Sequence, residues 1–208
     1  MFLKRLPLGS MQTNCYILAD EDTKECAIFD PSAEADRIMS VVEENGFDVK
    51  YIILTHVHAD HVMALDKVKR LTGADIVAHR CDAEMLNDNG YTLSGLFFTS
   101  APQSKADVVA EDGDTLTIGN LEFRFIHTPG HTLGGMCILC GDTLISGDTL
   151  FAGSVGRTDF PGGDHKKLID SIKDKLMVLD DDINVYPGHG PSTTIGYERE
   201  NNPYLERL

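Results

Sequence analysis

The stretch Tyr51–His61, YIILTHVHADH, joins a short apolar run directly to a cluster of histidines. The continuous apolar run Tyr51–Leu54 is typical of a strand that is buried on both faces of a sheet. Imidazole and carboxylate groups, which follow where this strand ends, are ligands of zinc, iron or manganese. The stretch therefore predicts an α/β fold with a metal site at one edge of a sheet. Its potential ligands are His56, His58, Asp60 and His61.

Three later motifs also place a polar residue directly after an apolar strand candidate. They follow the runs 123–126, 144–146 and 183–186, and a glycine precedes the polar residue in each motif. Glycine allows the sharp reversals that such loops need, and loops after aligned strands converge on one sheet edge. Because seven nitrogen or oxygen ligands exceed the four of a closed structural zinc site, the sequence predicts two adjacent metals with open positions. The predicted ligands are His56, His58, Asp60, His61, His131, Asp148 and His189.

Other histidines and cysteines are not expected to bind metal. His79, His127 and His165 have no potential ligand at metal-binding spacing in the sequence. Cys137 and Cys140 match a CxxC motif, but they lie in an apolar run that is typical of a strand. Residues three apart in a strand point to opposite faces, so we expect two separate buried side chains.

The remaining pattern alternates helices with strands and then becomes strand-rich, over what we expect to be a single domain, residues 1–208. Residues 87–102 show weak periodicity and are predicted to be a long loop, a candidate lid over a site. The main expected features are a helix from Pro31–Ser32 to Gly46, a helix over Val62–Thr72 ended by Gly73, a hairpin turn at Gly119–Asn120, a helix capped by Asp164, a strand over Ile183–Tyr186 and a short C-terminal helix.

Composition limits the partners. The chain has 33 acidic and 18 basic residues, a formal net charge of −15, so we expect no nucleic acid as partner. Its N-terminus has no apolar stretch of membrane-spanning length, and we expect no membrane association and no export. Five cysteines without disulfide-framework spacing favour a reducing compartment, and we predict a cytoplasmic location.

In its motifs the chain resembles the glyoxalase II-like branch of the metallo-β-lactamase superfamily. The resemblance rests on four motifs in the expected order, THVHADH (55–61), TPGHT (128–132), GDTLF (147–151) and PGHG (187–190). It implies a four-layer αββα sandwich and two divalent ions, with zinc first and iron or manganese as alternatives. It also implies that one ion is held by His56, His58 and His131, the other by Asp60, His61 and His189, that Asp148 bridges them, and that Asp60 and Asp148 are the catalytic carboxylates.

The resemblance further implies hydrolysis of a small-molecule thioester, S-lactoylglutathione or a related acyl-thioester. A hydroxide between the metals would attack the carbonyl carbon, while one metal polarises the carbonyl oxygen and the other receives the thiolate. Two divalent ions, two carboxylates and a hydroxide sum to a formal charge of about +1. The site should therefore attract an anion or a polarised carbonyl, although the whole chain is acidic.

The segment 153–160, GSVGRTDF, resembles the loop in which glyoxalase II holds a glutathione carboxylate with a basic residue. Arg157 matches this substrate-binding role, with a surface ion pair to Asp159 or Asp164 as the alternative. Asp159 also stands where that enzyme is expected to carry a tyrosine. Only about twenty residues follow His189, fewer than the C-terminal helical domain of glyoxalase II needs. We therefore expect the hydrolytic site without expecting glutathione specificity.

The strongest alternative is a persulfide dioxygenase, an oxidoreductase that resembles this chain and binds one iron at positions equivalent to His56, His131 and Asp148. Such a set of two histidines and one carboxylate leaves open positions for oxygen chemistry. The completeness of the second ligand set favours two metals instead. A nuclease would want a basic groove, a β-lactamase an export signal, and a non-catalytic metal-binding module would not need an intact ligand set.

Overall fold

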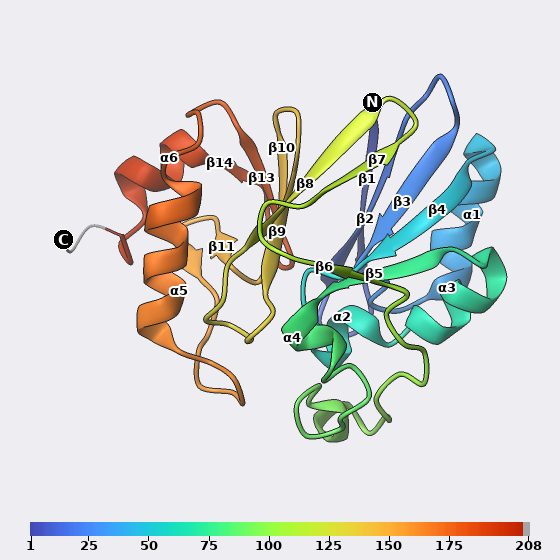
Figure 1. Ribbon diagram of the computed structural model, residues 1–208, viewed down its shortest axis with the longest axis horizontal. Helices are drawn as coiled ribbons and strands as arrows, with labels where there is room; N and C mark the ends of the chain where they lie inside the picture. The colour runs from blue at the N-terminus through green and yellow to red at the C-terminus, as the bar shows by residue number, and fades with distance from the viewer. Residues whose placement is uncertain (206–208) are drawn as a thin grey trace.

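The first half of the chain forms a six-stranded sheet. In the computed structural model, which describes residues 1–205, its strand order is β1-β2-β3-β4-β5-β6 (Figure 1). The pairs β1–β2 and β2–β3 are antiparallel, whereas β3 to β6 run parallel. The strands are β1 (Phe2–Leu8), β2 (Thr13–Ala19), β3 (Glu25–Phe29), β4 (Asp48–Ile53), β5 (Asp75–His79) and β6 (Val108–Ala110). The helical segments are α1 (Ala35–Asn45), α2 (Ala59–Val62), α3 (Leu65–Thr72), α4 (Arg80–Ala83) and the 3-10 turn η1 (Ser94–Phe97).

The second half forms another six-stranded sheet, of order β14-β13-β10-β9-β8-β7. Only β10 and β13 are parallel neighbours in this sheet. Its strands are β7 (Thr115–Ile118), β8 (Leu121–His127), β9 (Met136–Cys140), β10 (Thr143–Gly147), β13 (Asn184–Pro187) and β14 (Thr193–Thr194). A small hairpin, β11 (Leu150–Phe151) and β12 (Ser154–Val155), precedes α5 (His165–Ser171), which continues as the π-helical turn η2 (Ile172–Leu176); α6 (Ile195–Asn201) follows β14.

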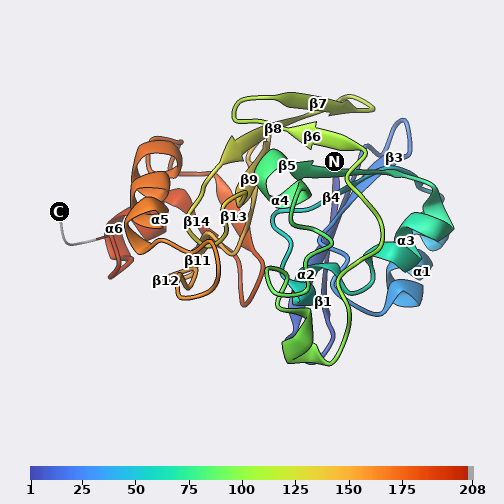
Figure 2. The ribbon, with the colours of Figure 1, turned by 60° about the horizontal axis from the view of Figure 1, so that its bottom comes forward.

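The two sheets pack face to face and carry helices on their outer sides, as the views in Figures 1 and 2 show. Three apolar clusters match this four-layer arrangement. One joins the first sheet to α1 and α3, one lies between the sheets, and one joins the second sheet to α5. On β2, Cys15 and Ile17 belong to the first cluster and Tyr16 and Leu18 to the second, as strand alternation requires. The predicted αββα sandwich is confirmed.

Most of the predicted elements are present. Gly46 and Gly73 end α1 and α3 with positive φ, and the Asp164 side chain caps α5. Cys137 packs beneath α5, whereas Cys140 lies between the sheets, so the two cysteines point to opposite faces as expected. No helix within residues 1–205 is long and apolar enough to span a membrane.

Two predicted helices are wrong in their extent. The helix expected over Val62–Thr72 is two helices, because the chain bends at Ala64, whose N–H donates to the carbonyl of Pro31. The helix expected from Pro31 begins only at Ala35, after Glu34 adopts a left-handed conformation. The first of these breaks matters for function, since it leaves α2 as a single turn that carries part of the His cluster.

Candidate metal centre

All seven predicted ligands lie in segments that follow the carboxyl ends of strands. These strands belong to both sheets, and the segments meet at one edge of the sandwich. His56 follows β4, and His131, Asp148 and His189 follow β8, β10 and β13. Strand β9 is antiparallel to both neighbours and β13 is parallel to β10, so β8, β10 and β13 end at the same edge. The convergence that the sequence predicted is therefore present in the fold.

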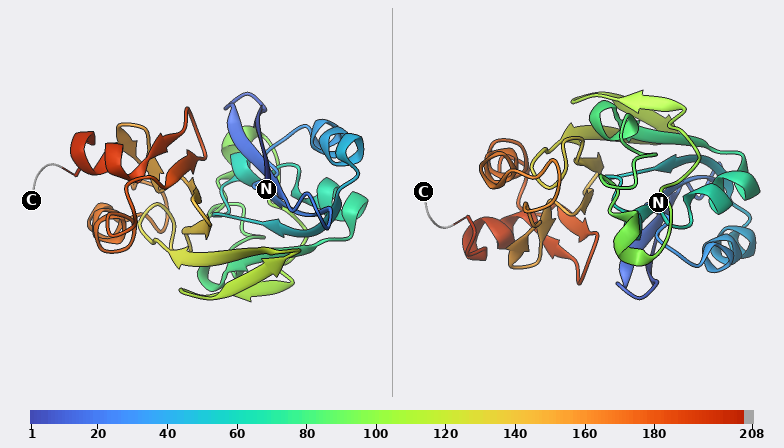
Figure 3. Two further views of the ribbon diagram at one scale, coloured as in Figure 1. Left: turned by 90° about the horizontal axis from the view of Figure 1, so that it is seen from above. Right: turned by 90° about the horizontal axis from the view of Figure 1, so that it is seen from below.

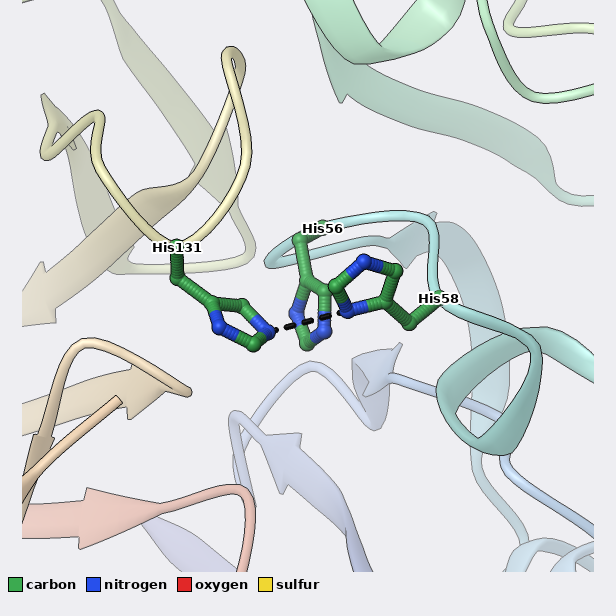
Figure 4. Close-up of side chains that lie close together, drawn as sticks. All are labelled: His56, His58 and His131. Atoms are coloured by element: carbon green, nitrogen blue, oxygen red, sulfur yellow. Dashed lines mark hydrogen bonds between the residues drawn. The ribbon is translucent and has the colours of Figure 1, made fainter. Parts of the chain in front are cut away.

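The first group consists of His56, His58 and His131, whose ring nitrogens lie within 4.8 Å of one another. Figure 4 shows the three rings pointing toward one another from two different loops. His58 Nδ1 lies 2.9 Å from His131 Nε2, and all three rings are buried. Burial, and then charge repulsion from His131, lowers the pKa of His58 to about 3. His58 therefore presents a neutral imidazole, the form that binds metal.

The second group consists of Asp60, His61 and His189. His189 Nε2 lies 3.1 Å from Asp60 Oδ2, which also accepts from Thr13 Oγ1. Burial would raise the pKa of Asp60, but the charge of His61 and the hydrogen bond from His189 outweigh it and lower the pKa. This carboxylate is therefore held in its anionic form.

Asp148 lies between the two groups. Its Oδ1 is 3.3 Å from His61 Nε2 in the second group, and its Oδ2 is 3.6 Å from His131 Nε2 in the first. Burial opposes ionisation of this carboxyl, but the electrostatic effect of the nearby His61 prevails and holds its pKa well below the usual range. Its position is the one expected of a bridging carboxylate.

Acceptors outside the cluster fix three histidine tautomers. Nδ1 of His56 lies 3.1 Å from Thr55 Oγ1, whose own proton goes to Asp30, so the ring donates there. Nδ1 of His61 donates to Asp30 and Nδ1 of His131 donates to the carbonyl of Arg157, at 2.9 and 2.7 Å. Each ring consequently directs Nε2 into the cluster, as in metal sites whose second ring nitrogen donates a hydrogen bond.

The cluster has the donor atoms that a metal ion requires. Among residues 1–205, four buried side-chain atoms lack any hydrogen-bond partner, and every one belongs to a predicted ligand. Unpaired buried polar atoms are costly unless something binds them. The four atoms are His56 Nε2, His58 Nε2, His61 Nε2 and Asp148 Oδ1. The residues therefore fit divalent metal ions, while the assignment of each ligand remains a prediction.

Asp30 is a site residue that sequence reasoning missed. It is buried at the end of β3, accepts from both the N–H and the hydroxyl of Thr55, and lies within ligand distance of His56 and His61. Because its oxygens already accept these hydrogen bonds and that of His61, it acts as a hydrogen-bond acceptor for ligands. The only sequence signal is a carboxylate that closely follows an apolar strand, a pattern that Asp148 shares.

Glycine is required where the ligand loops approach one another. A Cβ at Gly188 would overlap Asp148 Oδ1 and His61 Cε1, so this residue leaves room for both side chains. Gly147 has a positive φ, and a Cβ there would overlap the hydroxyl of Thr55. The glycines that the sequence associated with chain reversal also allow this close packing.

A cavity of about 440 Å³ opens over the cluster. It is lined by ligands from both groups, by Met11, by Leu93, Leu96 and Phe97, and by the segment after β10. Arg157 lines it too, but both Nε and Nη2 donate to the Asp159 carboxylate at 2.7 Å, and the guanidinium lies 3.9 Å from the Phe160 ring centroid. The two roles weighed for Arg157, substrate contact and an ion pair with Asp159, are thus both open to it.

His79 and His127 lie outside the metal cluster but are not isolated. Their rings stack with centroids 3.8 Å apart, although they are 48 positions apart in the sequence. His79 Nδ1 accepts the N–H of Cys81. Sequence spacing could not have paired these two residues.

An αββα sandwich with a cluster of seven histidine and aspartate side chains at its open edge defines a class of metal-dependent enzymes. The family model of the metallo-beta-lactamase superfamily matches residues 8–189. The chain belongs to this superfamily, whose members are mostly metal-dependent hydrolases and bind divalent metals.

Two named hydrolases are among the relatives that match nearly the whole chain. The probable metallo-hydrolase YqgX of Bacillus subtilis is 38% identical over 97% of this chain and 96% of its own length. The hydroxyacylglutathione hydrolase GloC of Haemophilus influenzae is 36% identical over 99% of this chain and 98% of its own length.

Three solved structures with more than 30% sequence identity share the fold of this chain. BLEG-1 B3 metallo-beta-lactamase has a TM-score of 0.93 at 37% identity and covers 99% of this chain and 100% of its own. TTHA1623 in a di-iron-bound form has a TM-score of 0.86 at 32% identity, over 97% and 100%. ETHE1 from Myxococcus xanthus has a TM-score of 0.83 at 32% identity, over 98% and 84%.

Proposed function

We propose that the protein is a metal-dependent hydrolase that cleaves thioesters of small molecules. The observation that carries the proposal is the second ligand group, Asp60, His61 and His189, complete and directly beside the first. A site for a single metal would not need this group. The name of the relative GloC, a hydroxyacylglutathione hydrolase, supports a thioester as the substrate.

In the reaction, water adds to the thioester carbonyl, the C–S bond breaks, and a carboxylic acid and a thiol leave. Two divalent ions, when bound, would supply a nucleophilic hydroxide at neutral pH and polarise the carbonyl. His56, His58 and His131 would hold one ion and Asp60, His61 and His189 the other, with Asp148 in contact with both. Buried Asp30 keeps the proton on His61 Nδ1 and thereby orients Nε2 toward the cluster.

The rest of the cavity binds and orients the substrate. Arg157 lies at its border, and its ion pair with Asp159 is exposed, so a substrate carboxylate could replace Asp159 at little cost. We propose that Arg157 holds an anionic group on the thiol side of the substrate. We propose no macromolecular partner, and cytoplasmic location stays a prediction.

The proposal is tested by metal analysis together with hydrolysis assays. Purified protein should contain about two divalent ions per chain, as expected of a two-metal site, and hydrolyse S-lactoylglutathione or an acyl-thioester. Chelation should abolish hydrolysis, and readdition of zinc, iron or manganese should restore it. Undiminished hydrolysis by metal-free protein would overturn the proposal. A β-lactam belongs in the panel because of the similarity to BLEG-1.

A persulfide dioxygenase is the second candidate, favoured by the similarity to ETHE1. It would use one iron on His56, His131 and Asp148, which lie together in the cluster. The two candidates differ in what His61 and His189 do. His189→Ala should lower both metal content and activity in a two-metal hydrolase. Oxygen uptake with glutathione persulfide, one iron per chain and an active His189→Ala variant would instead establish the oxidoreductase.

A further inference from the structure

The cavity over the metal centre has an apolar wall on one side. Met11, in the turn between β1 and β2, lies together with Leu93, Leu96 and Phe97 from the loop 87–102. We call these four residues the apolar wall. Figure 3, in its right-hand view, and Figure 2 show the green segment around residues 93–98 beside the dark blue turn that follows β1. Two segments far apart in the sequence thus form one surface.

The apolar wall exposes side chains that would ordinarily be buried. Leu96 is 63% exposed and Met11 52% exposed, next to a cavity that leads to the ligands. Contiguous exposed apolar surface at the border of a cavity marks a binding site. The wall therefore offers binding energy to an apolar group that removes it from water.

Hydrogen bonds attach the loop 87–102 to the segment that carries the metal ligands. The carbonyl of Thr92 accepts the N–H of Ala59 at 2.7 Å, which fixes the loop to α2 beside the ligands. The hydroxyls of Thr92 and Ser94 lie 2.7 Å apart, and both side chains are fully buried. These contacts hold the start of the segment that carries Leu93, Leu96 and Phe97 beside the ligand loop.

The basic group of the cavity comes from a different segment than the apolar wall. Apart from the predicted ligands, the polar lining residues are Ser154 and Arg157, which share the segment after β10 with the apolar lining residues Phe151, Val155 and Phe160. Among the lining residues of the described chain, Arg157 is the sole lysine or arginine. An anionic substrate group is therefore accommodated near Arg157 and not along the apolar wall.

We propose that the substrate's acyl group is an apolar carbon chain, which lies along the wall of Met11, Leu93, Leu96 and Phe97 while the thiol part lies toward Arg157. This inference rests on the proposed thioester hydrolysis and names its substrate class. A hydroxyacyl group as small as lactoyl would leave most of the wall in water. Longer straight acyl chains would cover it and react more efficiently.

The test compares acyl chains on one thiol. Acetyl, butyryl and hexanoyl thioesters of glutathione are assayed with the metal-loaded protein, and kcat/KM should rise about fourfold for each methylene that the wall removes from water. In a second series, the acyl group stays acetyl and the thiol is ethanethiol, butanethiol or hexanethiol. A flat acyl series, or a rise confined to the thiol series, would overturn the inference while leaving thioester hydrolysis intact.

A matched pair of variants locates the effect. Leu96→Ser removes an exposed apolar side chain from the wall, and Leu71→Ser makes the same change on α3, where the side chain is 54% exposed and does not line the cavity. We expect Leu96→Ser to lower kcat/KM for hexanoylglutathione about fivefold with little effect on acetylglutathione. Leu71→Ser should change neither. Equal effects of the two substitutions would contradict binding at the wall.

Binding of thioethers separates this inference from the proposed function. N-acetylcysteamine thioethers with alkyl groups of two, four and six carbons cannot be hydrolysed, and their affinity is measured by calorimetry. Affinity that rises with chain length and falls in Leu96→Ser supports the apolar site even if no thioester is cleaved, which would overturn only the hydrolase. Affinity that is independent of chain length would overturn the apolar site.

Discussion

Asp30 Oδ2 lies 2.9 Å from Nδ1 of His61 and also accepts the hydroxyl of Thr55 at 2.6 Å. Through these two contacts one buried carboxylate orients His61 directly and His56 through Thr55. The two histidines belong to different ligand groups. Asp30 therefore couples the geometry of both proposed metal positions.

Replacement of Asp30 by alanine should weaken metal binding. Loss of a carboxylate that orients ligand histidines typically lowers metal affinity about 10- to 100-fold. Competition with a chelator, followed by metal analysis, measures the change. The matched control is Asp180→Ala, which removes an exposed carboxyl group that belongs to neither ligand group. If Asp30→Ala retained the metal affinity of the unaltered protein, the coupling through Asp30 would be disproved.

Gly188→Ala should abolish metal binding without unfolding the protein. The added Cβ would overlap both Asp148 and His61, so these side chains must move apart. Gly46→Ala is the control, because Gly46 has a positive φ but no atom within 4 Å of the place that a Cβ would take. Both substitutions should lower the melting temperature, and only the one at 188 should lower metal content and hydrolysis. Full metal content in Gly188→Ala would show that the close approach is not required.

The sequence predicted which side chains gather in the cluster because each is defined by local spacing. The segment 55–61 and the three later motifs follow their strands directly, so the fold only had to align the strand ends. Asp30 escaped prediction because its role depends on Thr55 and His61, 25 and 31 positions later in the chain. Local pattern carries no information on such a contact.

The same reason explains the elements that were missed. The charged residues Lys4 and Arg5 and the proline Pro7 obscure the alternation of apolar and polar side chains in strand β1. The strand nevertheless pairs with β2 and forms the edge of the first sheet. Residues 87–102 are a loop as predicted, apart from the turn η1, but their part in the cavity depends on Met11, which lies about 80 positions earlier in the chain. Substrate-binding surfaces assembled from loops were thus the least predictable part.

His79 should make the protein less stable at mildly acid pH. Burial, and then the stacked ring of His127, lowers the pKa of His79 to about 4, from an ordinary value of 6.5. As pH falls from about 6.5 to 4, the unfolded chain takes up a proton that the folded chain does not, so the free energy of unfolding decreases. The contribution of this residue is up to about 3 kcal/mol.

His79→Asn isolates this contribution, since asparagine can still accept the N–H of Cys81 at the start of α4. Urea unfolding of metal-free protein at pH 7.5 and pH 5 gives the free energy of unfolding for both forms. The variant should lose less stability between these pH values than the unaltered protein. An identical loss in both would mean that His79 does not titrate in this range.

Arg157 and Asp159 should have opposite effects on substrate binding. Removal of the guanidinium in Arg157→Ala should raise KM for an anionic thioester more than it lowers kcat, because the residue borders the cavity and has no contact with the reacting atoms in the proposed mechanism. Asp159→Asn removes the charge that now pairs with Arg157, so the guanidinium becomes available and KM should fall. Steady-state kinetics with a glutathione thioester and with an uncharged N-acetylcysteamine thioester distinguishes the roles. Only the KM of the anionic substrate should respond to either change. Unchanged kinetics in both variants would mean that Arg157 forms a surface ion pair with Asp159 and does not bind the substrate.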